Sequence, residues 1–158
     1  MSLSEIRNAE IEYCRDHIVY FAEKYGHIED RNSPEIVVPF RLWKEQREAL
    51  VDMLNHKWTI ILKARQLGIS WLVLHYAVWL LLCHTGRSVI GLSKSETEAK
   101  ELIRRAVLIL RNMRALIREK TDKQNWDGAW FEWNSLSVTI HFPGKSDSTF
   151  QCFASGEN

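Results

Sequence analysis

The sequence has 158 residues, of which 21 are Lys or Arg and 20 are Asp or Glu, so its formal net charge is +1. With 46% hydrophobic residues, seven Gly and three Pro, the composition excludes a disordered, collagen-like or linker-rich chain. The length fits one ordinary domain with a real core, and the near-neutral charge excludes a strong overall attraction to nucleic acid or membrane.

The cysteines and the apolar runs indicate a reduced, cytosolic protein. Cys14, Cys83 and Cys152 are far apart in the sequence and show neither a CxxC nor a Cys/His zinc spacing, so no disulfide framework is expected. The charged N-terminus lacks the apolar segment of a signal peptide. The longest apolar run, Trp71–Cys83, is too short to span a bilayer, so we expect no membrane association.

The N-terminal segment predicts one helix over residues 3–25. Ser2 and Glu5 have the spacing of a capping box at its start. Apolar residues then recur at helical intervals, and Gly26 is a plausible stop. We treat residues 1–39 as a lead-in to the main domain.

Four further elements follow in chain order. Residues 36–38 indicate either a short strand or a packed extended segment, and residues 43–55 indicate an amphipathic helix. Residues 58–62 are apolar and mostly β-branched, which predicts a buried strand. A polar loop separates that strand from residues 71–83, which are almost entirely apolar and predict a buried helix.

The second half alternates strands and helices before it ends in a hairpin. Residues 88–92 predict another buried strand, and Ser95 begins an amphipathic helix with capping-box spacing. Residues 129–142 predict a hairpin and residues 149–154 a further strand. Strand, loop, helix, strand, helix is the order of a βαβ unit, so the expected fold class is α/β, with a parallel sheet flanked by helices.

The loop before the apolar helix is the most informative segment. A phosphate-binding P-loop follows G-x-x-x-x-G-K-[ST], in which backbone N–H groups hold phosphate, the lysine binds the β- and γ-phosphates and the hydroxyl ligates Mg²⁺. This loop keeps the second glycine as Gly68 and the hydroxyl as Ser70. Lys63 stands where the first glycine is expected, and Ile69 where the lysine is expected.

Two interpretations of this loop remain open on the pattern alone. A glycine and a serine at a strand-to-helix junction are also typical of a simple tight turn with a helix cap. The expected strand and helix on either side favour a phosphate site, as do two cations, Lys63 and Arg65, before an uncharged helix. A lysine at the start of the loop could fold across it and reach the same phosphates.

The loop also resembles the deviant Walker A motif of bacteriophage terminase large subunits, some of which place the lysine first. Phe40–Gln46 is similar to the adenine-recognition segment of that family, and residues 89–100 to its second ATPase-core strand and loop. Residues 150–158 are similar to the strand preceding its Walker B. The resemblance covers roughly residues 40–158 and implies a P-loop NTPase of the RecA-like (ASCE) class, carrying N-terminal helices and a C-terminal β-hairpin.

The resemblance also implies site residues and cofactors, namely ATP and Mg²⁺. Lys63 and Arg65 take catalytic roles at the phosphates, although Arg65 could instead tie the loop to a carboxylate. Ser70 ligates the metal, and Gln46 hydrogen-bonds the adenine edge. The cofactor-binding loop as a whole comprises Lys63, Ala64, Arg65, Gln66, Leu67, Gly68, Ile69 and Ser70.

The implied function is ATP-driven packaging of double-stranded viral DNA into procapsids in the host cytoplasm. The implied partners are a small terminase subunit, a portal protein and further copies in a ring. The Walker B carboxylates are not found in residues 40–158, so we expect an incomplete ATPase domain that binds nucleotide with little or no turnover. A helicase-like DNA-dependent ATPase fragment and a non-catalytic α/β interaction module remain alternatives.

Basic and aromatic side chains offer a possible DNA surface. A solvated helix face is the simpler interpretation of the arginines in the second half, and packing is the better default for most tryptophans. Of these, Trp58, Trp71 and Trp79 lie in runs predicted to be core. The arginines that could reach DNA phosphates are Arg104, Arg105, Arg111, Arg114 and Arg118.

Overall fold

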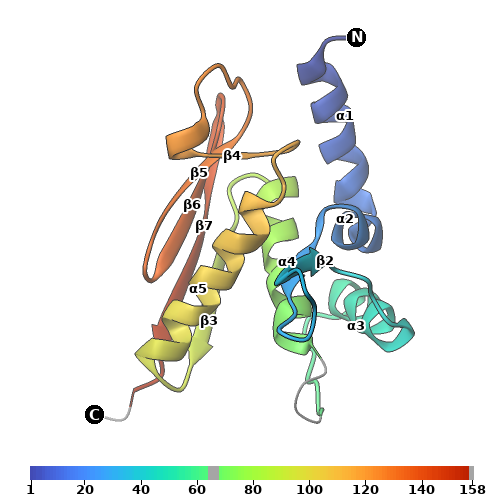
Figure 1. The fold of residues 1–158 in the computed structure, drawn as a ribbon, viewed down its shortest axis with the longest axis vertical. Helices are drawn as coiled ribbons and strands as arrows, with labels where there is room; N and C mark the ends of the chain where they lie inside the picture. The colour runs from blue at the N-terminus through green and yellow to red at the C-terminus, as the bar shows by residue number, and fades with distance from the viewer. Residues whose placement is uncertain (64–67, 157–158) are drawn as a thin grey trace.

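The computed structural model describes residues 1–63 and 68–156, which form two layers. One layer is a five-stranded sheet of order β3-β7-β6-β5-β4, and the other consists of helices packed against one face of that sheet (Figure 1). A small two-stranded sheet, β1-β2, joins the helical layer. None of the helices in the described part of the chain combines the length and hydropathy needed to cross a membrane.

The N-terminal region forms two helices, α1 (Leu3–Asp16) and α2 (Ile18–Tyr25). The predicted capping box is confirmed: the Ser2 hydroxyl accepts from the Glu5 N–H, and the Glu5 carboxylate accepts from the Ser2 N–H. The predicted stop at Gly26 is also confirmed, since Gly26 caps α2.

The prediction of one continuous helix over residues 3–25 is wrong, because the chain breaks at His17. The φ and ψ of His17 are −135° and 70°. Its ring Nδ1 lies 2.8 Å from the Tyr13 carbonyl oxygen, which would accept the His17 backbone N–H in a continuous helix. That N–H bonds to the Cys14 carbonyl instead. The side chain thus competes with the backbone for one acceptor, and the apolar periodicity does not reveal this.

The next elements agree with the sequence. Strand β1 (His27–Glu29) pairs antiparallel with β2 (Val37–Pro39), and helix α3 (Lys44–Asn55) follows. The predicted strand at 36–38 and helix at 43–55 are therefore confirmed to within one residue.

The predicted buried strand over residues 58–62 is wrong. No strand forms there in the described residues, and the exposed fractions of Trp58, Ile60 and Leu62 are 84%, 97% and 101%. Hydrophobic, β-branched residues form a strand only where a neighbouring strand and a packing surface receive them. Strand β3 (Ser88–Ser93) has one paired neighbour among the described strands, β7 (Lys145–Ala154), so residues 58–62 do not add a strand beside it.

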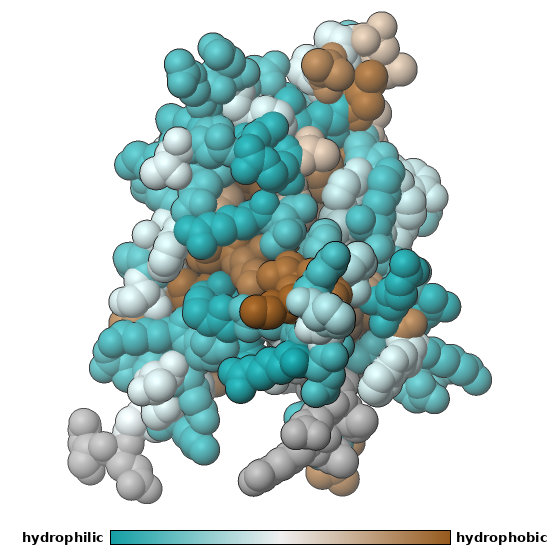
Figure 2. Space-filling model, in the orientation of Figure 1, coloured by the Kyte–Doolittle hydropathy of each residue, from teal (hydrophilic) through white to brown (hydrophobic). Residues whose placement is uncertain are grey.

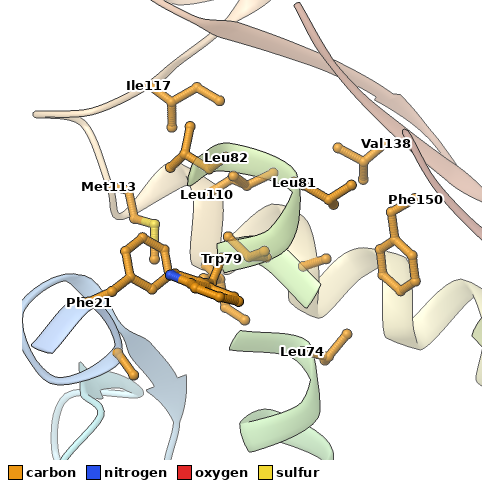
Figure 3. Close-up of a cluster of buried hydrophobic side chains, with 14 of the residues drawn as sticks. Phe21, Leu74, Trp79, Leu81, Leu82, Leu110, Met113, Ile117, Val138 and Phe150 are labelled. Carbon is orange, nitrogen blue, oxygen red and sulfur yellow. The ribbon is translucent and has the colours of Figure 1, made fainter. Parts of the chain in front are cut away.

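Helix α4 (Ile69–Cys83) is the predicted buried helix, and it forms the centre of the core. Trp79 is buried, and its Nε1 donates to the Cys14 carbonyl at 2.8 Å, which ties α4 to α1. Figure 3 shows Leu74, Leu81 and Leu82 of α4 among side chains from α2, the sheet and helix α5 (Glu96–Arg111). One hydrophobic core therefore joins the N-terminal helices to the sheet.

The remaining strands are β4 (Arg118–Glu119), β5 (Trp130–Asn134) and β6 (Ser137–Phe142), with a 3₁₀ turn, η1 (Lys120–Asp122), after β4. The predicted hairpin is confirmed, and β7 continues it. The predicted parallel sheet is found in part: β3–β7 and β4–β5 are parallel, whereas β5–β6 and β6–β7 are antiparallel, so the sheet is mixed. Two-residue links join β5 to β6 and β6 to β7, and such short links permit only antiparallel pairing.

The second strand of the predicted βαβ unit is present, but it is not buried. Strand β3 is an edge strand, and the exposed fractions of Ile90 and Leu92 are 62% and 70%. The described helices lie on one face of the sheet (Figure 1), so side chains on the other face meet solvent. Figure 2 shows the molecule in the orientation of Figure 1. This side is mostly hydrophilic, with hydrophobic side chains near its middle where α5 meets the small sheet.

Candidate functional site

A cleft of about 970 Å³ lies where the β1–β2 hairpin, the starts of α3 and α4, and helix α5 meet. It brings together residues from three separate parts of the chain. Ala64, Arg65, Gln66 and Leu67 lie outside the described residues. The described members of the predicted site all line the cleft, namely Gln46, Lys63, Gly68, Ile69 and Ser70.

The N-terminus of α4 opens into this cleft. Gly68 is the N-cap residue, and the Leu72 N–H makes the first helical bond to its carbonyl at 3.0 Å. The N–H groups of Ile69, Ser70 and Trp71 have no partner within the helix, and the helix dipole places partial positive charge there. Because α4 contains no charged residue, nothing within the helix offsets this charge. The cleft is therefore suited to an anion at this end.

Gly68 is required by its conformation and by its neighbour. Its φ is +67°, and a Cβ at this position would lie 3.0 Å from Gln46 Nε2. Gln46 is buried, and its Oε1 accepts from the Trp43 N–H at 3.0 Å. The Gln46 amide therefore lies between the starts of α3 and α4, where the sequence predicted a nucleotide contact.

The Gly68→Ala substitution should lower the free energy of unfolding by about 1–2 kcal/mol, because an L-residue is strained at positive φ. Crowding against Gln46 adds to that cost. Gly144→Ala is the matched control, since its φ is +68° and nothing lies within 4 Å of its Cβ position. Urea denaturation of both variants measures the difference. Equal losses in the two variants would contradict the contact with Gln46.

The most exposed of the described aromatic residues that line the cleft is Trp43, which the sequence did not single out. The exposed fraction of Trp43 is 57%, and it lines the cleft directly before α3. Phe40 lies in the same predicted adenine segment but is buried, with its ring centre 4.6 Å from that of His75. Trp43 stands in the same segment, Phe40–Gln46, and this membership is the signal in the sequence that could have pointed to it.

The charges around the cleft are mainly positive. Two carboxylates line it, and one of them, Glu29, is neutralised by Arg104 at 2.6 and 2.7 Å. Asp30 accepts from the Asn32 N–H. Within the described residues, three of the four lining cations make no ion pair or side-chain hydrogen bond; Arg105 is the exception. The four are Arg31, Arg41, Lys63 and Arg105.

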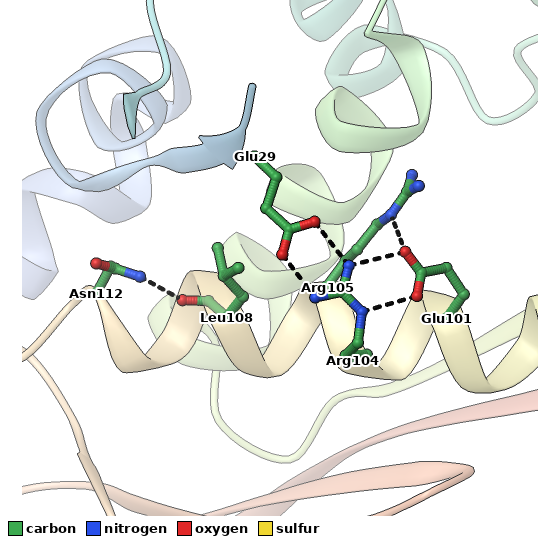
Figure 4. Close-up of polar contacts among 6 residues, drawn as sticks. All are labelled: Glu29, Glu101, Arg104, Arg105, Leu108 and Asn112. Carbon is green, nitrogen blue, oxygen red and sulfur yellow. Dashed lines mark hydrogen bonds and ion pairs between the residues drawn. The ribbon is translucent and has the colours of Figure 1, made fainter. Parts of the chain in front are cut away.

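A network of ion pairs joins one wall of the cleft to α5 (Figure 4). Arg104 donates to Glu29 on β1 and also to Glu101 on its own helix. These bonds hold the pKa of Glu29 below its usual range and lower the pKa of Glu101 to about 2. Arg105 donates to Glu101 from Nε at 2.9 Å. Both carboxylates therefore stay ionised at neutral pH.

The other arginines of the predicted DNA surface are also paired. Arg111 donates to Glu119 at 2.8 Å, and both Arg114 and Arg118 contact Asp122. These pairs agree with the preferred interpretation of a solvated face. Of the tryptophans predicted to be core, Trp71 and Trp79 are buried, whereas Trp58 is exposed.

Among the described residues that line the cleft, Ser70 carries the hydroxyl group that can ligate a divalent metal, and its side chain is exposed. No group of three or more His, Cys, Asp or Glu side chains among residues 1–63 and 68–156 could hold a metal ion. Mg²⁺ commonly takes only one or two protein ligands and fills its remaining positions with water and substrate phosphates. The donor set therefore fits Mg²⁺ that arrives with a phosphate ligand.

His75, inside α4, makes stability depend on pH. Burial lowers the pKa of His75 from 6.5 to about 4, and its Nδ1 lies 2.6 Å from the Trp71 carbonyl oxygen. The unfolded chain takes up this proton below pH 6.5 while the folded chain does not, so stability falls as pH drops from 6.5 to 4. We expect a loss of about 2 kcal/mol between pH 7 and pH 5 from this residue.

Thermal unfolding of wild type and His75→Gln across this pH range measures the effect. The variant should have a flatter profile than wild type. His56→Gln, at an exposed position, should keep the wild-type profile. A His75→Gln profile as steep as that of wild type would contradict the assignment.

Most of the fold matches part of a phage large terminase ATPase domain. The domain from Thermus phage P74-26 gives a TM-score of 0.50 at 17% identity, covering 73% of this chain and 51% of that chain. A mutant of the same domain gives 0.48 at 18% identity with the same coverage. This chain thus spans about half the length of the domains it matches. No protein-family model and no curated protein matches the sequence.

The first of these matches confirms the resemblance to terminase ATPase domains at the level of fold. The residue roles that the resemblance implies remain predictions.

Proposed function

We propose that this chain is the ATP-binding part of a viral DNA-packaging motor, a terminase large subunit. The observation that carries the proposal is the cleft itself. It gathers Gln46, Lys63 and the N-terminus of α4 from separate segments, in a fold that matches a terminase ATPase domain. Its volume and its surplus of cations suit a nucleoside triphosphate.

In this proposal the triphosphate lies on the first N–H groups of α4. Lys63 neutralises its outer phosphates, and Ser70 supplies a hydroxyl to Mg²⁺, which when bound offsets phosphate charge. The adenine ring stacks on Trp43, and the Gln46 amide contacts its edge. We assign the rest of the loop, Ala64, Arg65, Gln66 and Leu67, to the phosphates as well, with Arg65 nearest the γ-phosphate.

The larger function follows by the same proposal. Residues 40–158 form the N-terminal portion of the motor domain, and residues 1–39 lead into it. Hydrolysis drives double-stranded DNA into a procapsid in the host cytoplasm, in a ring of subunits that works with a small terminase subunit and a portal protein. Turnover needs a carboxylate for Mg²⁺ and another for water. We assign neither role within residues 1–158 and expect little hydrolysis by this chain alone.

Isothermal titration with ATP and Mg²⁺ tests the proposal on this chain. We expect one site per chain, with binding weakened by added salt because phosphate recognition is electrostatic. ADP should compete, whereas adenosine, which lacks phosphate, should bind far more weakly. Absence of ATP binding by a folded chain would favour the non-catalytic interaction module.

A further inference from the structure

A second cation faces the phosphate end of the cleft from a different element. Arg105 lies on α5 and lines the cleft, and its guanidinium carbon is 5.1 Å from the centre of the Trp71 ring. Trp71 belongs to the first turn of α4, directly after Ser70. Arg105 therefore lies near the N-terminal turn of α4, where the helix dipole favours an anion.

The neighbouring arginine shows what is unusual about Arg105. Arg104 uses all three guanidinium nitrogens, on Glu29 and Glu101, in four contacts of 2.6–2.8 Å. Arg105 uses only Nε, on Glu101. In the part of the chain that the structure describes, no hydrogen bond involves its two terminal nitrogens. Figure 4 shows them pointing away from both carboxylates. Their N–H donors remain available to a ligand.

Glu101 and Trp71 also fix where this guanidinium can lie. The bond from Nε to Glu101 holds one edge of the group, and the indole ring supports it by a cation–π contact. The exposed fraction of the Arg105 side chain is 30%, against 47% for Arg104. Such a restrained, partly buried arginine loses little freedom when it binds, and its planar fork matches two phosphate oxygens.

We propose that Arg105 binds the phosphates of the nucleotide, as a second cation beside Lys63. This inference rests on the proposed nucleotide site. Because α5 also holds β1 through Arg104 and Glu29, a phosphate that engages Arg105 binds two walls of the cleft together: the N-terminus of α4 and the α5–β1 unit. Glu101 acts as a positioning residue for both arginines.

Calorimetry with two ligands separates the phosphate role from general effects on the cleft. The ligands are ATP with Mg²⁺ and inorganic tripolyphosphate with Mg²⁺. We expect Arg105→Gln to weaken both by about tenfold, since a charged hydrogen-bond donor to phosphate is lost. Trp43→Ala should weaken ATP alone, because tripolyphosphate has no base to stack. Arg111→Gln, on the same helix but paired with Glu119, should bind both ligands as wild type does.

Several outcomes would overturn the inference. If wild type binds ATP and a folded Arg105→Gln binds both ligands within about twofold of wild type, Arg105 is not a phosphate ligand, and the nucleotide site itself stands. If wild type binds neither ligand, the proposed function and this inference both fail. Should Arg105→Gln unfold, Arg105→Lys replaces it, because it keeps the charge but loses the fork. An intermediate loss supports the inference, and wild-type affinity for both ligands overturns it.

Discussion

Replacement of Lys63 by alanine should weaken ATP binding by about tenfold to a hundredfold, as expected when a cation that binds phosphate is removed. Lys63 lines the cleft, is exposed, and makes no ion pair or hydrogen bond with another described residue. Its removal therefore costs no structural contact in the described part of the fold. Under the proposed function, the same change should abolish turnover by the motor, because the lysine would offset charge on the transferring phosphoryl group.

The matched control is Lys57→Ala, which removes an exposed lysine six positions earlier that does not line the cleft. It should leave ATP affinity unchanged. Calorimetry measures both variants, and thermal unfolding should show equal midpoints for both and for wild type. ATP affinity that is the same in Lys63→Ala and in wild type would remove Lys63 from the site.

Truncation of Leu82 should lower the free energy of unfolding more than any other substitution proposed for this chain. Leu82 is almost fully buried in α4, among residues of α5 and the segment after it (Figure 3). Leu82→Ala removes buried methyl groups and leaves a cavity, at a cost of about 2–5 kcal/mol. Small domains have total stabilities of about 5–15 kcal/mol. At the lower end of that range, this variant would lose about two fifths or more of its free energy of unfolding.

Urea denaturation measures this cost as a shift in midpoint at constant slope. Leu54→Ala serves as the control, because Leu54 lies in helix α3 with an exposed fraction of 45%. Its effect should stay within about 0.5 kcal/mol. Similar losses in the two variants would contradict a core centred on α4.

Much of the fold followed from local patterns in the sequence. The capping residues Ser2 and Ser95, the stop at Gly26 and the almost entirely apolar run of α4 each predicted an element that the structure contains. These signals succeed because each depends on bonds made within a few residues. The two-residue hairpin turns belong to the same class.

The errors at residues 58–62 and at strand β3 concern features that depend on distant partners, whereas the break at His17 is a local effect of one side chain. Residues 58–62 have the composition of a buried strand, yet their burial depends on a neighbouring surface that the local pattern does not encode. Strand β3 also has the composition of a buried strand, yet it lies at the edge of the sheet and Ile90 is exposed. The break at His17 depends on one side chain taking one carbonyl, and the apolar period continues across it.

The sequence predicted which loop and which helix start contribute to the candidate site, but not which other elements would form the sides of the cleft. The loop pattern pointed to Lys63, Gly68 and Ser70, and the family resemblance pointed to Gln46; all four line one cleft. The role proposed for Arg105 could not be read from the sequence, because Arg104 and Arg105 are adjacent and chemically identical. Tertiary contacts distinguish them: Glu29 on β1 occupies Arg104, whereas Arg105 lies over Trp71 and lines the cleft.

Backbone amide chemical shifts during a titration with ATP and Mg²⁺ test most directly whether phosphate binds at the N-terminus of α4. The amides of Gly68, Ile69, Ser70 and Trp71 should shift together and saturate with the calorimetric affinity, because their N–H groups hold the phosphates. The indole N–H of Trp43 should shift with them. Saturating ATP that leaves these amides unchanged would contradict the account, whether the nucleotide binds elsewhere or not at all.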